Sequence, residues 1–186
     1  TLRMTEGELL TQKRLGAIDL TVAEYFEIID RKTAQLFAAA CSLPARIQPV
    51  REEAIEPLER FGRALGTCFQ LADDLLDFTA TSTALGKPVL SDLKEGKLTL
   101  PLLLLLPRIS PQERAKIERV LAERAFATVT SEEILEIVAR EGTLDEVARE
   151  ARRWAEEARQ ALALFPDSPA RRALEFAPDF VLHRSA

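Results

Sequence analysis

Apolar residues recur along this chain at intervals of three and four positions, and alternating strand-like runs are scarce. This period is typical of helices that turn one face toward a core. Start signals of the form Ser/Thr-x-x-Glu, whose side chains bond to the first free backbone N–H groups of a helix, divide the pattern. They are Thr21 with Glu24, Ser110 with Glu113, Thr130 with Glu133, and Thr143 with Glu146. The pattern therefore predicts an all-α protein.

The start signals and the prolines set the expected bounds of each helix. We expect a helix from Thr21 to about Cys41, a loop around Pro44 and Pro49, and a long helix over roughly residues 51–78. The later helices are expected at about 98–106, from 110 onward, at 130–142 with Gly142 as the end, at 143–164, and from 168 onward. Residues 79–95 are expected to form a loop, because they are rich in Thr, Ser, Gly and Pro.

The organisation predicted from this pattern is one all-helical domain over residues 1–186, without a tandem repeat or a linker. The first residues, from Thr1 to Glu6, already have the character of a helix interior, with no cap and no initiator methionine before them. We therefore expect the chain to be a fragment of a longer protein.

Residues 69–78 combine an apolar surface with a stripe of polar and acidic side chains. On a helix that turns about 100° per residue, Gln70, Asp73, Asp74 and Asp77 fall within an arc of about 100°. Apolar side chains occupy most of the remaining circumference, so we expect the helix to be buried. Unpaired carboxylates facing a protein interior would cost roughly several kcal/mol each. A positive group is therefore expected to face them.

The chemistry of the stripe narrows the identity of that positive group. Carboxylate oxygens suit a hard cation such as Mg²⁺, which usually bridges one or two carboxylates to phosphate oxygens. The sequence thus predicts that Asp73, Asp74 and Asp77 face Mg²⁺ and a phosphate-containing ligand. The alternative is an acidic face that is simply solvated, which the apolar remainder of the helix disfavours.

Lysines are found where an anionic ligand would need them. Lys32 interrupts the apolar stripe of the helix that begins at Thr21, and Thr33 lies at the edge of that stripe. Such a lysine either extends its ammonium group to solvent or meets an anion. Lys87 and Lys97 flank a Gly- and Pro-containing loop that directly follows the acidic helix, and point charges there would reach phosphate oxygens. Ordinary loop lysines are the alternative, and we interpret Lys94 in that way.

Composition excludes several other classes of protein. The chain has 186 residues, 47% hydrophobic and 30% charged, which fits a globular domain. A formal net charge of -5 and the lack of a long basic run argue against a nucleic-acid partner. The longest apolar run, residues 100–106, is too short for a transmembrane segment. Cys41 and Cys68 have no metal-type spacing and are expected to be buried, inert thiols, so we expect a cytoplasmic location.

Together these segments resemble the trans-isoprenyl diphosphate synthases, or polyprenyl synthetases. The matching stretches, in the order of that family, are Gly7-Glu8, Tyr25 through Arg31-Lys32-Thr33, Phe69-Gln70-x-x-Asp73-Asp74-x-x-Asp77, and Gly86-Lys87-Pro88 through Asp92 to Glu95-Gly96-Lys97-x-Thr99-Leu100-Pro101. The last two, at the spacing of the family, form a specific combination. The resemblance spans essentially the whole chain and implies the C-terminal part of an isoprenoid-synthase-type helical bundle, without its N-terminal helices.

The resemblance implies roles for single residues. The three aspartates would form the second aspartate-rich motif of the family and hold Mg²⁺, with Asp73 as the direct ligand. Catalytic and substrate-binding roles would belong to Lys32, Lys87 and Lys97, which would contact an allylic diphosphate. Thr33 and Gln70 would place the substrate and the developing carbocation, and Phe69 would line the pocket near isopentenyl diphosphate. The implied reaction is a head-to-tail prenyl transfer that follows Mg-assisted ionisation.

Two departures from the family pattern matter. Leu90 stands where the family usually has glycine, so the loop is expected to bend differently. The first aspartate-rich motif and the arginine pair of the family, which would bind two further magnesium ions and isopentenyl diphosphate, belong upstream of Gly7 and do not occur here. We therefore expect the chain alone to be inactive.

Three interpretations other than a prenyl-transferring enzyme stay open. The first is a non-catalytic subunit or truncated form of a heteromeric synthase. The second is a terpene cyclase-like enzyme with the same metal chemistry, and the third is a purely structural helical module. The stretch from Gly86 to Pro101 favours chain elongation over cyclisation. A homodimer is what the family resemblance implies, and the product chain length is left undetermined.

Overall fold

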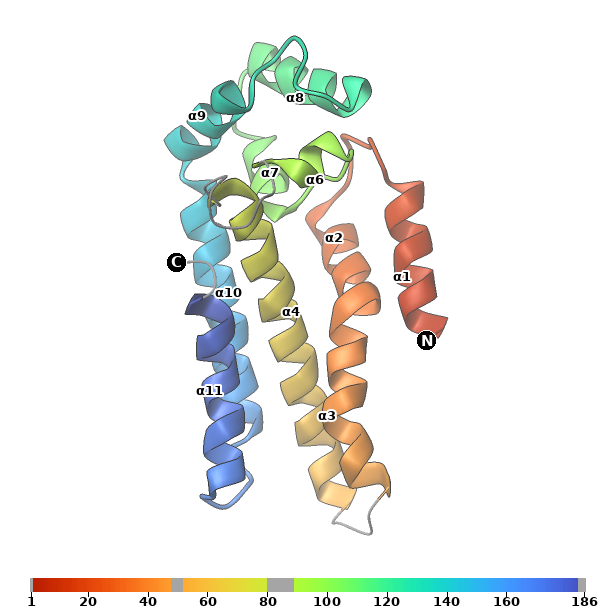
Figure 1. The fold of residues 1–186 in the computed structure, drawn as a ribbon, viewed down its shortest axis with the longest axis vertical. Helices are drawn as coiled ribbons and strands as arrows, with labels where there is room; N and C mark the ends of the chain where they lie inside the picture. The colour runs from red at the N-terminus through yellow and green to blue at the C-terminus, as the bar shows by residue number, and fades with distance from the viewer. Residues whose placement is uncertain (1, 48–51, 80–88, 184–186) are drawn as a thin grey trace.

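A computed structural model describes residues 2–47, 52–79 and 89–183, and every element within these ranges is a helix (Figure 1). The central element is the long helix α4 (Ile55–Thr79), which follows the short 3-10 turn η2 (Glu52–Ala54). Helix α3 (Gln35–Ile47) lies along one side of α4 and helix α10 (Thr143–Ala161) along another. The predicted all-α class is confirmed, and α4 is the predicted long acidic helix.

The remaining helices flank or cap this bundle. Helix α1 (Leu2–Lys13) lies beside α2 (Val22–Ile29), and α11 (Pro169–His183) runs beside α10. Helices α6 (Ser91–Lys94) and α7 (Leu100–Leu105) lie near the C-terminal end of α4, where α8 (Pro111–Glu123) and α9 (Ser131–Glu141) form the top of the molecule in Figure 1. Residues in the described part of the expected loop at 79–95 therefore include one turn of helix.

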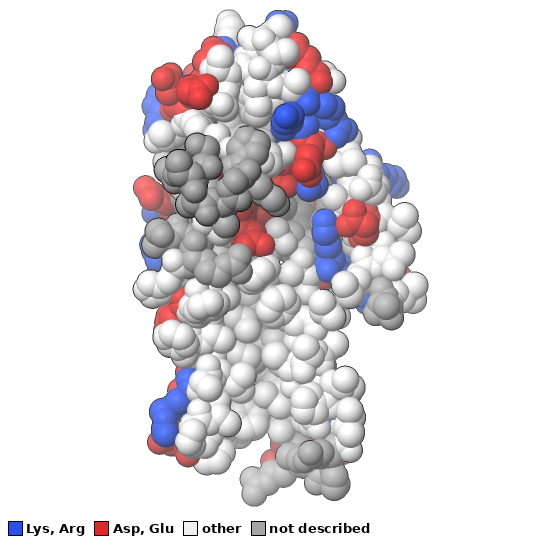
Figure 2. All heavy atoms as spheres, viewed as in Figure 1, with Lys and Arg blue, Asp and Glu red and all other residues white. Residues whose placement is uncertain are grey.

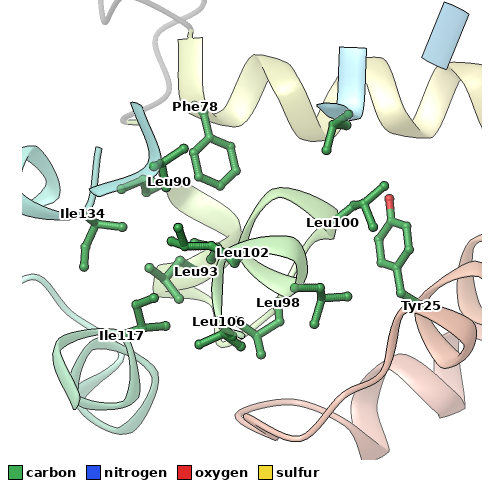
Figure 3. Close-up of a cluster of buried hydrophobic side chains, with 14 of the residues drawn as sticks. Tyr25, Phe78, Leu90, Leu93, Leu98, Leu100, Leu102, Leu106, Ile117 and Ile134 are labelled. Atoms are coloured by element: carbon green, nitrogen blue, oxygen red, sulfur yellow. The ribbon is translucent and has the colours of Figure 1, made fainter. Parts of the chain in front are cut away.

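Two apolar clusters hold the bundle together. The upper one has the leucines around α7 at its centre, between Phe78 of α4, Ile117 of α8 and Ile134 of α9 (Figure 3). The lower one joins α4, α10 and α11 and includes Phe61 and Cys68. Cys68 is buried as predicted, whereas Cys41 is only half-buried.

The helix predicted from Thr21 to about Cys41 is interrupted and longer than expected. The capping box of Thr21 and Glu24 starts α2 as predicted, but residues Asp30–Ala34 form a π-helical segment, η1, before α3 continues to Ile47. Pro44 lies inside α3, so the prediction that it marks a loop is wrong. An internal proline costs about 3 kcal/mol, and α3 buries residues against α4 on both sides of it, which outweighs that cost.

Of the three other predicted capping boxes, two are formed and one is not. The capping boxes at Ser110 and Thr130 are both formed, and Gly142 ends α9 as predicted. The box predicted at Thr143 is not formed, because Gly142 in a left-handed conformation caps α10 and places Thr143 inside the first turn. The Thr143 hydroxyl is buried without a hydrogen-bond partner. Helix α10 ends at Ala161, three residues before the predicted end.

Candidate functional site

A pocket of about 110 Å³ opens beside the upper half of α4, between that helix, α1, α2 and the segment before α7. Its charged lining residues are Arg14, Lys32, Asp74, Asp92 and Lys97. In Figure 2, acidic and basic side chains face one another across a hollow in the upper part of this face. The structure thus brings Lys32, Lys97 and Asp74, which are far apart in the sequence, to one cavity.

Asp74 is the most deeply buried member of the acidic stripe, with 1% of its surface exposed. The Tyr25 hydroxyl donates a hydrogen bond to Asp74 Oδ2 at 2.5 Å, and Gln70 Nε2 donates one to Oδ1 at 3.0 Å. Burial raises the pKa of Asp74 to about 7, although the hydrogen bonds from Tyr25 and Gln70 act in the opposite direction. Burial and the neighbouring Asp74 raise the pKa of the Tyr25 phenol well above its ordinary value.

Asp77 accepts hydrogen bonds from the backbone of residues 90–92. Its Oδ1 accepts a hydrogen bond from the Ser91 N–H at 2.9 Å, and its Oδ2 accepts one from the Asp92 N–H at 3.2 Å. Its main-chain oxygen also accepts from the Leu90 N–H at 2.7 Å. Burial, followed by the charge of Asp92, raises the pKa of Asp77 to about 6. The last acid of the motif therefore fixes the start of α6 to the end of α4.

Leu90 adopts a left-handed backbone conformation, with φ 58° and ψ 33°. This conformation is the one that glycine adopts without steric cost and that other residues adopt at a cost. The expected different bend of the loop stays a prediction, because residues 80–88 lie outside the described residues, while Leu90 itself adopts the conformation that glycine favours. Its side chain is fully buried in the upper cluster (Figure 3), which provides the compensating contacts.

The two lysines of the pocket are held by carboxylates. Lys32 Nζ lies 3.1 Å from Glu8 Oε2, and Lys97 Nζ lies 3.1 Å from Asp92 Oδ1 and 2.6 Å from Glu95 Oε2. Partial burial disfavours the charge of Lys97, but hydrogen bonds to Glu95 and Asp92 raise its pKa above the ordinary value. The Lys97 ammonium group therefore stays charged at neutral pH. The carboxylate partners of both lysines are ones that a more highly charged anion would replace or share.

The backbone around Lys32 is fixed by the π-helical segment and by α1. A Cβ added at Gly7 would lie 2.5 Å from the Lys32 nitrogen, so α1 approaches this segment closely only because residue 7 is glycine. Single π-helical turns inside α-helices are frequent at functional sites. Thr33, in the same segment, donates a hydrogen bond to Gln70 Oε1 at 3.1 Å. Thr33 and Gln70 therefore meet, as residues with a shared role would.

The other predicted residues lie apart from the pocket or outside the described ranges. Asp73 is half-buried on α4, one turn from Gln70 and from Asp77. Phe69 packs against Phe37 of α3, with ring centroids 5.4 Å apart, and is not among the pocket-lining residues. Lys87 lies outside the described residues, so its predicted role stays a prediction.

No three His, Cys, Asp or Glu side chains converge closely enough to hold a metal ion by themselves within the parts of the chain that the structure describes. Asp73, Asp74 and Asp77 share an arc of α4 but do not form such a group of three, and their predicted metal roles stay predictions. None of the described helices is long and apolar enough to cross a membrane.

Several residues of this site were missed by the reasoning from sequence. Tyr25 has no predicted role of its own, but its hydroxyl points toward α4 and donates a hydrogen bond to Asp74 (Figure 3). Asp92 had no role and Arg14 was not singled out, yet both line the pocket. The signal for Tyr25 was available, because a tyrosine two turns before Lys32 carries a polar end into the same face.

The sequence of the chain is similar to those of known prenyl diphosphate synthases. The sequence profile of the family described as Polyprenyl synthetase matches residues 1–138. Octaprenyl diphosphate synthase of Escherichia coli K12 is 39% identical over 171 residues, which are 92% of this chain and 53% of that protein. Short chain isoprenyl diphosphate synthase of Methanothermobacter thermautotrophicus is 36% identical over 183 residues, which are 98% of this chain and 56% of that protein.

Solved structures give the same result. A decaprenyl diphosphate synthase from Rhodobacter capsulatus superposes with a TM-score of 0.90 at 33% identity, covering 100% of this chain and 57% of the other. A polyprenyl synthase from Caulobacter crescentus CB15, solved with calcium and isoprenyl diphosphate, gives 0.88 at 40% identity, covering 100% and 56%. The chain therefore spans little more than half the length of these relatives. The chain belongs to the polyprenyl synthetase family and has its all-helical fold.

Proposed function

We propose that this chain is the diphosphate-activating part of a prenyltransferase, in which an allylic diphosphate is ionised with the help of Mg²⁺ and elongated by isopentenyl diphosphate. The observation that carries the proposal is the pocket itself. It places the cationic Lys32 and Lys97 beside Gln70 and the acidic stripe of α4. The relatives named above are prenyl diphosphate synthases, which supports this class of enzyme.

The side chains of the pocket fit a diphosphate bound together with a hard cation. Lys32 and Lys97 line the pocket and supply point charges for phosphate oxygens. Asp73, which is not among the lining residues but lies one turn from Gln70 on α4, would supply an oxygen ligand to the cation. When bound, magnesium supplies positive charge at the departing diphosphate, which stabilises the leaving group. The Caulobacter structure contains calcium with isoprenyl diphosphate, and this supports a divalent ion at such a site. Lys87 would add a third cation.

The remaining residues position the substrate and exclude water. Thr33 and Gln70 place oxygen atoms beside the pocket, where electron-rich groups favour a developing carbocation. Leu20, Ile28 and Leu98 line the apolar part of the cavity and would shield that cation from water. Direct metal binding is proposed for Asp73; the metal roles predicted for Asp74 and Asp77, and the substrate contact predicted for Phe69, stay predictions.

A second candidate is that this chain works only with a companion polypeptide, as a subunit of a heteromeric synthase. The chain covers 53% of the octaprenyl synthase and 57% of the decaprenyl synthase. Under this proposal the chain binds diphosphate with magnesium but does not turn over alone. A homodimer, a cytoplasmic location and a single domain over residues 1–186 remain predictions, and a terpene cyclase-like activity is the less favoured alternative.

The direct test is binding of inorganic pyrophosphate and Mg²⁺ to the whole chain, measured by calorimetry and thermal unfolding. At a ligand concentration a hundred times Kd, the folded state should gain about 2.7 kcal/mol. We expect Asp73→Ala and Lys97→Ala to lose most of this gain. Lys94→Ala, which changes an exposed lysine of the same loop, is the matched control and should keep it. Equal stabilisation of Lys97→Ala and Lys94→Ala would contradict the proposed role of Lys97.

Products then distinguish the candidate functions. The chain is supplied with isopentenyl diphosphate, an allylic diphosphate and Mg²⁺, with and without a polypeptide that corresponds to the unmatched half of a relative. Elongated prenyl diphosphates support prenyl transfer. Cyclised hydrocarbons formed from the allylic diphosphate alone would support the cyclase alternative instead.

A further inference from the structure

A chain of hydrogen bonds joins three elements along the wall of the pocket. Tyr25 comes from α2, Thr33 from the π-helical segment η1, and Gln70 and Asp74 from α4. The contacts run from the Tyr25 hydroxyl to Asp74 Oδ2 at 2.5 Å, from Gln70 Nε2 to Asp74 Oδ1 at 3.0 Å, and from Thr33 Oγ1 to Gln70 Oε1 at 3.1 Å. We call these four side chains the Tyr25–Thr33 relay.

The donor and acceptor chemistry gives the relay a direction. Both carboxyl oxygens of Asp74 accept hydrogen bonds, Oδ2 from the Tyr25 hydroxyl and Oδ1 from the Gln70 amide nitrogen, so the Gln70 amide turns its nitrogen inward. The carbonyl oxygen of Gln70 is thereby turned toward Thr33, which donates its single hydroxyl proton to it. Because its proton is used in this hydrogen bond, the Thr33 hydroxyl can act only as an acceptor toward any other group. Both oxygens at this end of the relay are therefore electron-rich.

Burial separates the inner end of the relay from the outer end. Tyr25 is 4% exposed and Asp74 is 1% exposed, whereas Thr33 and Gln70 are only partly buried. Each carboxylate oxygen of Asp74 already accepts a hydrogen bond from a side chain inside the protein. The neighbouring Asp73 points about 100° away around the helix and is more exposed. The two adjacent acids of the motif are thus placed for different tasks.

We propose that Tyr25 and Asp74 are positioning residues that orient the Gln70 side-chain amide, with its carbonyl oxygen toward Thr33, and that Asp74 acts on the site through Gln70 rather than as a metal ligand. The structural part of this proposal stands on the relay alone. Its catalytic meaning rests on the proposed function, because the oriented oxygens would face the allylic cation that forms when the diphosphate leaves.

The relay is testable in the whole chain by NMR of side-chain amides. The sequence contains six glutamines and no asparagine, so few side-chain NH₂ pairs occur, and a Gln70→Glu variant assigns the Gln70 pair. In Tyr25→Phe, Asp74 loses the donor that fixes one of its oxygens and is free to turn. We expect the Gln70 NH₂ pair to shift and its exchange with solvent to accelerate by about tenfold or more.

Gln35 provides an internal control in the same spectrum. Its Nε2 also donates to a carboxylate, Asp30 Oδ2, at 3.0 Å, but it has no link to Tyr25. The Gln35 pair should keep its shift and exchange rate in Tyr25→Phe. If both pairs lose protection, the packing has loosened, and Thr33→Val then tests the relay from its other end. An unchanged Gln70 pair in both Tyr25→Phe and Thr33→Val would overturn the proposal.

The second part of the proposal is tested by the dependence of pyrophosphate binding on Mg²⁺. Asp73→Asn and Asp74→Asn keep the shape of each side chain and remove one charge. We expect the apparent Mg²⁺ affinity to fall about tenfold more in Asp73→Asn than in Asp74→Asn. Equal losses would overturn the positioning role of Asp74. If the unchanged chain binds no pyrophosphate at all, the proposed function fails instead, and the amide spectra still decide whether the relay exists.

Discussion

The two halves of α4 are held in place by different means. In the lower half, a Cβ added at Gly62 would lie 2.4 Å from the Phe37 carbonyl oxygen, and one added at Gly66 would lie 2.8 Å from Ala34 Cα. In the upper half, Asp74 and Asp77 are held by hydrogen bonds from other segments. The lower half of α4 is therefore held by close backbone contact with α3 at glycines. The upper half is held by hydrogen bonds of polar side chains, which also orient the groups of the pocket.

This difference indicates which substitutions each half of α4 tolerates and which it does not. Close helix packing at glycine tolerates no added volume, because the neighbouring atoms are backbone and do not move easily. Buried carboxylates depend instead on their hydrogen-bond partners and on their state of ionisation. Substitutions in the lower half should therefore affect the stability of the whole bundle, and substitutions in the upper half should affect the loop and the pocket.

The largest effect is expected at Gly62. A Gly62→Val substitution would force α3 away from α4 and should destabilise the protein by about 3 kcal/mol or more, measured by urea unfolding. Ala39→Val, at an exposed position of α3, is the matched control and should change the unfolding free energy little. A Gly62→Val variant with unchanged stability would show that the two helices are free to separate.

The next effect concerns Leu90, which anchors the loop at the upper end. Leu90→Ala removes a fully buried side chain and should cost about 2–5 kcal/mol. Leu90→Gly loses the same contacts but removes the left-handed strain, which is worth about 1–2 kcal/mol. The glycine variant should therefore unfold at a higher urea concentration than the alanine variant, although both are less stable than the unchanged chain. The opposite order would argue that residue 90 carries no strain.

Asp77 tests whether a polar side chain fixes the loop. Asp77→Asn keeps one acceptor oxygen but turns an NH₂ group toward a backbone N–H, so one of its two hydrogen bonds to Ser91 and Asp92 is lost. We expect a cost of about 1–3 kcal/mol and faster hydrogen exchange at those two amides. Exchange at amides in the lower half of α4 should stay the same, and a uniform change along α4 would contradict the division into two halves.

The pH dependence of stability should separate the halves as well. The pKa values of Asp74 and Asp77 are raised to about 7 and about 6, so the folded state binds more protons than the unfolded state between about pH 4 and 7. Without metal, stability should therefore fall as pH rises through that window, by at most about 1.4 kcal/mol per pH unit and group. Asp74→Asn should flatten the curve of thermal midpoint against pH, and an equally steep curve in that variant would rule out Asp74 as its source.

The smallest effect is expected at Thr143, whose buried hydroxyl has no hydrogen-bond partner. Thr143→Val keeps the shape and removes the unsatisfied group, so the protein should gain up to about 1 kcal/mol. A loss of stability on thermal unfolding would indicate that water or another group satisfies the hydroxyl.

The sequence predicts the outline of this fold well, because capping and amphipathic periods are local signals. Thr21, Ser110 and Thr130 begin helices as their Glu partners indicated. Thr143 failed because Gly142 next to it competes for the same cap, and Pro44 failed because packing against α4 outweighs a local break. Element boundaries were wrong where a neighbour, rather than the segment itself, decides the outcome.

Several residues of the candidate site could be predicted from the sequence, but their hydrogen-bond partners could not. The arc of Gln70 and the acids follows from helix geometry, and Asp74 does line the pocket. That Asp74 binds Tyr25 and that Asp77 binds the backbone at Ser91 depends on how three segments meet in space. The period of a helix shows which residues share a face, but it does not show what lies opposite that face.

Because of the π-helical turn at Asp30–Ala34, the number of residues between α2 and α3 is as important as their identity. Such a turn accommodates one residue more than an α-helix of the same rise, and each residue corresponds to a rotation of about 100°. Deleting one residue here would restore a regular helix and turn the side chains inside the segment, Lys32 or Thr33 among them, by about 100° relative to a flanking helix. Redesigns of this protein should therefore treat chain length between Ile29 and Gln35 as fixed.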